Sequence, residues 1–106
     1  MNQFAYVLRP TRPQMLTDGP TADEARVIGD HFAYLQGLLA AGSLKLAGRA
    51  TDAGERTFGI VVFEAVDSAA AAALMAADPS VREGVMAVEL FPFRIALMAG
   101  GEGIEG

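Results

Sequence analysis

Two side chains in this sequence have the chemistry of an acid–base pair. His31 is the single histidine, and Asp78 stands directly before Pro79. An imidazole changes its charge near neutral pH and a carboxylate can fix its orientation, so the two together can move protons. Each residue also has a simpler interpretation. His31 can be a core residue with a satisfied hydrogen bond, and Asp78 can cap a helical turn that begins at Pro79.

The surroundings of His31 in its predicted helix agree with both interpretations. From Thr21 to Ala41 apolar residues recur at helical spacing, and His31 falls within the stripe that they form, whose members are Val27, Ile28, Leu35, Leu38 and Leu39. An imidazole N–H that is buried without a partner costs about 1–3 kcal/mol, so His31 needs a polar neighbour. Asp30 points well off the stripe and is a poor candidate for that role.

Further candidates lie near the first helix and in the loop before it. Tyr34 follows His31 by one helical turn and is a candidate for the same pocket. Arg12 lies in a long loop between Pro10 and Pro20, where a guanidinium can bind a carboxylate or a phenolate. The commoner role of such an arginine is a solvated one.

Composition excludes several classes of function. The 106 residues suffice for one domain, and 13 acidic against 8 scattered basic residues give a net charge of −5, which disfavours nucleic-acid binding. The longest apolar run, from Ala69 to Ala77, is shorter than the roughly 20 residues that span a bilayer. We therefore expect no nucleic-acid partner and no membrane contact, and the absence of cysteine fits a cytoplasmic protein.

Metal and cofactor sites find equally little support. The absence of cysteine excludes disulfides, thiolate catalysis and Cys-ligated zinc, and one histidine cannot form a multi-histidine site. The stretch from Gly101 to Gly106 spells G-x-G-x-x-G, but no helix follows it, so it is not a dinucleotide-binding loop. We predict no metal and no cofactor; a Mg²⁺ or Ca²⁺ site of carboxylates alone is the open alternative, and no ligand spacing supports it.

The chemistry-bearing residues must be positioned by four strands and two helices. Apolar alternation, caps and turn signals predict strands at 3–9, 43–50, 57–65 and 85–98, helices at 21–41 and 69–77, and a hairpin turn at 52–55. Thr21 and Glu24 are predicted to form a capping box at the start of the first helix. The order is β-α-β-β-α-β, an α+β ferredoxin-like fold. Right-handed crossovers place both helices on one face of a four-stranded antiparallel sheet. Residues 1–98 form the domain, and residues 99–106 are expected to be a flexible tail.

The other face of this sheet is predicted to be apolar as well. The third strand carries apolar residues on both faces, and the fourth, interrupted by Pro92, nearly does. A solvated face would alternate with polar residues. We therefore expect a homodimer in which two sheets pack against each other.

Several segments in a fixed order give the chain a family resemblance. They are Asp30 to Leu35 (DHFAYL), Leu44 to Gly48 (LKLAG), Phe58 to Glu64 (FGIVVFE), Met75 to Val81 (MAADPSV) and Gly84 to Phe93 (GVMAVELFPF). In this combination the chain, from about Phe4 to Met98, resembles the YCII-related family, which implies a dimeric α/β barrel of ferredoxin-like subunits.

The resemblance implies roles for individual residues. It makes His31 a catalytic acid or base and Asp78 its orienting carboxylate, close enough to hydrogen-bond directly or through one water at the edge of a cleft. At two positions the chain differs from many members. Arg49 stands where many have proline, and it is either an anion clamp for a substrate or a solvated strand end. Phe91 stands where close members have histidine, so a mechanism with two histidines is not available.

Two functions follow as alternatives. The first is a cofactor-independent enzyme that uses the His31–Asp78 pair for proton transfer, elimination or isomerisation on a small cyclic or carbonyl-containing molecule. The second is a non-catalytic binding or accessory domain in which His31 is structural. The first assigns catalysis to His31 and Asp78 and substrate binding to Tyr34, Arg49 and Arg12.

Overall fold

The predicted order of strands and long helices is confirmed, and two short helices are added to it. The computed structural model describes residues 1–52, 54 and 56–100. Its elements are β1 (Asn2–Pro10), α1 (Gln14–Thr17), α2 (Ala22–Ala40), β2 (Leu44–Arg49), β3 (Gly59–Ala65), α3 (Ser68–Ala76), α4 (Pro79–Arg82) and β4 (Met86–Phe93). Helix α1 lies in a segment that we predicted as a loop, and α4 is the helical turn after Asp78 that begins at Pro79.

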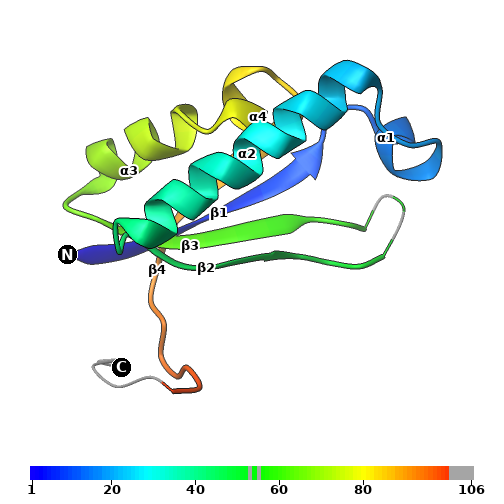
Figure 1. The fold of residues 1–106 in the computed structure, drawn as a ribbon. Coiled ribbons are helices and arrows are strands. Elements are labelled where there is room, and N and C mark those ends of the chain that lie inside the picture. The colour runs from blue at the N-terminus through cyan, green and yellow to red at the C-terminus, as the bar shows by residue number, and fades with distance from the viewer. Residues whose placement is uncertain (53, 55, 101–106) are drawn as a thin grey trace.

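The four strands form one antiparallel sheet in the order β2-β3-β1-β4. Helices α2, α3 and α4 lie over one face of it (Figure 1). Every second residue of β1 points to the helices, and Phe4, Tyr6 and Leu8 are all buried in the main core with Val61 and Phe63 of β3. The predicted ferredoxin-like arrangement, with both long helices on one face, is therefore confirmed.

Helix α2 begins and ends as its sequence requires. Thr21 and Glu24 form the predicted capping box, in which each side chain accepts a hydrogen bond from the other residue's backbone N–H. Gly42 follows the helix with a φ of +85°, which favours glycine. One residue differs from the prediction: Leu39 is 59% exposed, because the helical rotation places it beside the buried stripe and not in it.

The fourth strand is shorter than predicted and leaves the sheet early. Its pairing ends at Phe93, opposite Gln3 and one residue from the start of β1 at Asn2, so β1 could not pair with a strand that continued to Met98. The Gln3 side chain then accepts a hydrogen bond from the Ile95 backbone at 2.7 Å. Ile95 packs on the sheet face opposite the helices, so this face is partly covered by the chain itself.

Pro92 lies in β4, which is an edge strand, as a proline within a sheet requires. Of the predicted turn at 52–55, residues 53 and 55 lie outside the described part, as do residues 101–106 of the predicted tail. Among the residues described, no helix has the length and apolar character needed to cross a membrane.

We predict that replacing Gly37 with alanine stabilises the protein. Gly37 lies inside α2, and a Cβ there would meet no atom within 4 Å. Alanine should therefore raise the free energy of unfolding by about 0.5–1 kcal/mol, because it restricts the unfolded chain without a clash. Chemical denaturation measures this change.

The matched control is Gly42→Ala, at the end of the same helix. Its positive φ should make the same substitution destabilising by about 1–2 kcal/mol. A Gly37→Ala variant that unfolds at lower denaturant than the native chain would show that α2 needs glycine for a reason other than space.

Candidate functional site

The carboxylate of Asp78 lies at a sharp turn between two helices. Helix α3 ends at Ala76, and Asp78 adopts an extended conformation, as a residue before proline prefers, and caps α4. Its Oδ1 accepts a hydrogen bond from the Ser80 backbone N–H at 2.9 Å. The residue is fully buried, with 0% of its surface exposed. A buried charge of this kind must be compensated by hydrogen bonds.

His31 supplies one of those hydrogen bonds from the middle of α2. Its Nδ1 lies 2.7 Å from Oδ1 and 2.8 Å from Oδ2 of Asp78, and its side chain is 17% exposed. We predicted a hydrogen bond between these two residues, direct or through one water, and the structure shows a direct one across 47 positions of sequence. Asp30, the poorer candidate, instead pairs with Arg26 on the surface.

Two further residues that we had not assigned to the site hold the same carboxylate. The Tyr6 hydroxyl donates to Asp78 Oδ2 at 2.7 Å, and the Ser80 hydroxyl donates to Oδ1 at 2.9 Å. Both residues are fully buried. The Ser80 hydroxyl also lies 3.2 Å from His31 Nδ1. Asp78 thus accepts hydrogen bonds from β1, α2 and α4.

These contacts decide the ionisation of Asp78. Burial acts to raise the pKa of Asp78 and is the largest single influence, but several others oppose it. Hydrogen bonds from His31 and Tyr6, the charge of His31 and the Ser80 amide together hold the pKa below its ordinary value. Asp78 is therefore a carboxylate at neutral pH, and Nδ1 must donate the proton in its contact with Asp78.

The second ring nitrogen of His31 is left open. Within the described part of the chain, Nε2 has no hydrogen-bond partner, and no buried side-chain nitrogen or oxygen lacks one, so Nε2 is not buried. A neutral ring with its proton on Nδ1 carries an unshared electron pair on Nε2. The arrangement can therefore accept a proton at Nε2 while Asp78 stabilises the resulting imidazolium.

Tyr34 lies near the pair but uses its hydroxyl elsewhere. That hydroxyl donates to the Leu74 carbonyl at 2.7 Å and so ties α2 to α3. Burial and the nearby charge of Asp78 both raise the pKa of Tyr34. Its predicted role in substrate binding stays a prediction.

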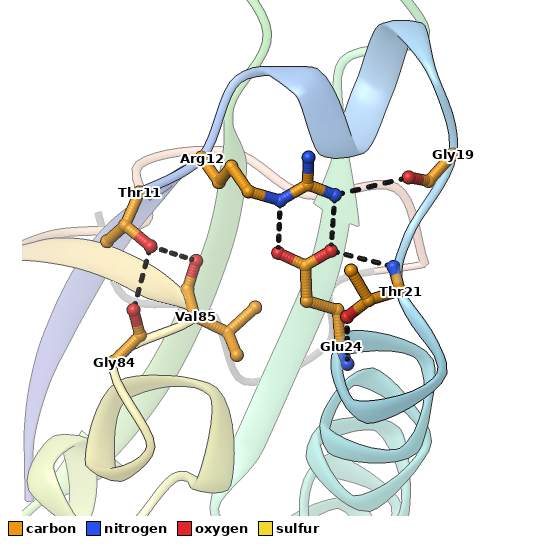
Figure 2. Close-up of polar contacts among 7 residues, drawn as sticks. All are labelled: Thr11, Arg12, Gly19, Thr21, Glu24, Gly84 and Val85. Atoms are coloured by element: carbon orange, nitrogen blue, oxygen red, sulfur yellow. Dashed lines mark hydrogen bonds and ion pairs between the residues drawn. The ribbon is translucent and has the colours of Figure 1, made fainter.

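Arg12 forms an ion pair within the protein (Figure 2). Its guanidinium donates two hydrogen bonds to the Glu24 carboxylate, at 2.8 and 2.6 Å, and a longer one to the Gly19 carbonyl. The Thr11 hydroxyl fastens the other end of this segment by donating to the Gly84 carbonyl at 2.7 Å. Arg12 thus holds the segment between β1 and α2 in place, while its predicted role in substrate binding stays a prediction.

Within the described residues, the structure places neither Arg49 nor an open hollow beside the His31–Asp78 pair. Arg49 is exposed at the end of β2, an edge strand, and no hydrogen bond among the described residues joins it to His31 or Asp78. An open hollow of about 570 Å³ lies where β1 begins and β4 ends, and none of the five candidate residues lines it. The substrate-binding role of Arg49 and a cleft beside the pair stay predictions.

Comparison with known proteins identifies the family. The model of the YCII-related domain matches residues 4–94, most of the chain. The chain belongs to the YCII-related domain family. The sequence resemblance that we found in the His31 helix, the Asp78-Pro79 turn and the last strand is therefore confirmed. No curated protein matches this YCII-related domain significantly.

A solved structure supports the fold. It is the 5-chloro-2-hydroxyhydroquinone dehydrochlorinase (TftG) from Burkholderia phenoliruptrix AC1100, determined in complex with 2,5-dihydroxybenzoquinone. It matches with a TM-score of 0.62 and 20% sequence identity, over 86% of this YCII-related domain and 93% of that chain. At this identity the similarity establishes the shared fold.

Sequence reasoning missed Tyr6 and Ser80, although a signal for Tyr6 was present. The alternation in β1 places Tyr6 among Phe4 and Leu8 on the buried face. A phenol hydroxyl in that position needs a hydrogen-bond partner, and Asp78 was the candidate carboxylate nearest the core. Ser80 gave no comparable signal, since a serine near the start of a helix is common.

We predict that Glu24→Gln changes the dependence of stability on pH. The Arg12 hydrogen bonds and the Thr21 amide lower the pKa of Glu24 from 4.5 to about 2. A lowered pKa means that the stabilisation is fully present above the unfolded-state value, near 4.5, and is lost as pH falls toward about 2. Glutamine keeps the capping box but removes the charge. The difference in denaturation midpoint between the native chain and Glu24→Gln should therefore shrink over that range.

Asp23→Asn is the control, because it removes an exposed partner of Arg26 one residue away. The difference in denaturation midpoint between Asp23→Asn and the native chain should vary less with pH. The difference in denaturation midpoint between the native chain and Glu24→Gln could instead stay constant from neutral pH to about 2. This result would contradict the assigned role of the Arg12–Glu24 pair.

Proposed function

We propose that this YCII-related domain is a cofactor-independent enzyme in which His31 is the acid–base catalyst and Asp78 its orienting carboxylate. The observation that carries the proposal is the asymmetry of the imidazole. Nδ1 is held by a buried, ionised carboxylate, while Nε2 has no partner among the described residues and is not buried. A purely structural histidine gains nothing from an open nitrogen, whereas a general base requires one.

The proposed reaction is a proton transfer on a small cyclic or carbonyl-containing compound. Nε2 removes a proton from a carbon or a hydroxyl of the substrate, and the electron pair of the broken bond moves into the conjugated system. In an isomerisation the imidazolium returns its proton at another atom, and in an elimination a leaving group departs with the displaced electrons. Asp78 accepts no proton in either case and stabilises the imidazolium by its charge and hydrogen bond.

The substrate class rests on the similarity to the dehydrochlorinase of chlorinated hydroxyhydroquinone. That protein was determined with a dihydroxybenzoquinone, a small ring with carbonyl and enolic hydroxyl groups. Such a compound has acidic protons that a single imidazole can remove. A chemically related ligand is therefore the first probe for this site, and Tyr34, Arg12 and Arg49 remain candidates to bind its oxygens.

A homodimer in the cytoplasm completes the proposal. On the sheet face opposite the helices, Leu46, Phe91 and Phe93 are each 42–44% exposed beside the part that Ile95 covers. A second copy would cover these side chains, and about 800 Å² per partner is the usual size of a stable contact. Two sheets facing each other would form the dimeric α/β barrel.

We predict that His31→Asn slows proton transfer by orders of magnitude. Small enolisable ketones and hydroxyquinones, 2,5-dihydroxybenzoquinone among them, are incubated in D₂O with the protein, and loss of their C–H signals is followed by NMR. The native chain should accelerate exchange of at least one of them, and His31→Asn should slow it by about 10²–10⁴-fold, the usual contribution of a general base.

Asp30→Asn is the matched control, because it alters a carboxylate next to His31 that faces solvent and pairs with Arg26. It should exchange as fast as the native chain. Equal rates for His31→Asn and the native chain would return His31 to a structural role and leave a binding or accessory domain as the function.

We predict that Phe91→Glu dissociates the dimer. A carboxylate in the middle of an apolar interface would be desolvated without a partner. Sedimentation or light scattering at micromolar concentration should find a dimer for the native chain and a monomer for the variant. Phe32→Glu on α2, where the side chain is 62% exposed, should stay dimeric. A native chain that is already monomeric would refute the sheet-to-sheet contact.

A further inference from the structure

We infer that Tyr6 and Ser80 are positioning residues that keep the His31 proton on Nδ1 and thereby keep Nε2 free to act as a base. The inference deepens the proposed function and rests on it for its catalytic meaning. Its structural part concerns only which ring nitrogen carries the proton, so it can be tested apart from any substrate.

Tyr6 is held too rigidly to follow a moving carboxylate. It lies in β1, which pairs with β3 on one side and β4 on the other. Its ring is fully buried and meets the Phe63 ring edge-on, with centroids 5.6 Å apart. The hydroxyl is therefore fixed in space, and its 2.7 Å contact sets the position of Asp78 Oδ2.

Ser80 fixes the other oxygen from the opposite side. Its backbone N–H and its hydroxyl both donate to Asp78 Oδ1, each at 2.9 Å. A helix cap needs only the first of these contacts. The second, together with the Tyr6 hydroxyl, exceeds what capping α4 requires. Both oxygens are thereby held within 2.8 Å of His31 Nδ1.

The donors also decide which partner carries the proton. Tyr6 and Ser80 each have one hydroxyl hydrogen and donate it in a hydrogen bond to Asp78, so both stabilise the ionised carboxylate. Without them a buried Asp78 would take up a proton from solvent more readily, and the neutral carboxylic acid would donate a hydrogen bond to an unprotonated Nδ1. The His31 proton would then lie on Nε2, and the exposed nitrogen could no longer accept one.

The other groups near Asp78 do not replace these donors. Tyr34 of α2 is close enough for its pKa to respond to the Asp78 charge, but its hydroxyl donates to the Leu74 carbonyl. The Asp78 backbone N–H bonds to the Met75 carbonyl and cannot serve its own side chain. Tyr34→Phe is therefore a matched control for Tyr6→Phe.

The test is the tautomer of His31, read from ¹⁵N–¹H correlations of protein labelled at histidine and recorded at a pH at which the ring is neutral. A single histidine makes the spectrum unambiguous. The native chain and Tyr34→Phe should show the Nδ1–H form. Tyr6→Phe and Ser80→Ala should each raise the Nε2–H fraction by about tenfold, as expected for loss of one hydrogen bond to a charged acceptor. The double variant should raise it further.

The outcomes separate the inference from the proposed function. A Tyr6→Phe variant that keeps the native tautomer overturns the inference, whatever its melting temperature. Should Tyr6→Phe fail to fold, Ser80→Ala, which removes only a hydroxyl, decides in its place. If the tautomer shifts while His31→Asn exchanges substrate protons at the native rate, the inference holds and the proposed function fails. If His31→Asn is inactive but neither Tyr6→Phe nor Ser80→Ala shifts the tautomer, the proposed function holds and the inference fails.

Discussion

The site is organised around a negative charge that has been taken out of water. The Asp78 carboxylate is fully buried, and a buried carboxylate without partners would be protonated or would unfold its surroundings. Here it is surrounded by donors from three elements: Tyr6 from β1, His31 from α2 and Ser80 from α4. Satisfying this one group therefore fixes the distance between the sheet and two helices. Four groups donate to the carboxylate, because Ser80 contributes both its backbone N–H and its hydroxyl. Among these residues only His31 has a further side-chain polar atom, Nε2, which is not buried.

Much of this arrangement follows from local sequence rules. The capping box at Thr21 and Glu24, the turn at Asp78-Pro79 and the alternation in β1 each depend on neighbouring residues, and each was predicted correctly. The helical stripe also required that His31 have a polar partner. The identity of that partner came from the family resemblance, because no local rule links residues 47 positions apart.

The features that sequence did not reveal depend on contacts between distant residues. Arg12 has the chemistry of an anion-binding residue, and only the fold places it against Glu24. The length of β4 is limited by where β1 begins, so a largely apolar pattern up to Met98 predicted too long a strand. The alternation in β1 tells which face of the sheet Tyr6 occupies and not which side chain it meets there. Such contacts need the three-dimensional register of the sheet.

The span of the Tyr6–Asp78 hydrogen bond has a consequence for how the protein acquires its site. Tyr6 lies in the first strand, and 72 positions separate it from its carboxylate partner. The same strand pairs with the last one, so β1 is completed on one side only when the end of the domain is available. Loops this long close slowly during folding, and contacts across them form late. During synthesis the nascent chain would therefore contain His31 well before the imidazole had an anion to orient it. His31 is therefore oriented by Asp78 only once nearly the entire domain has folded.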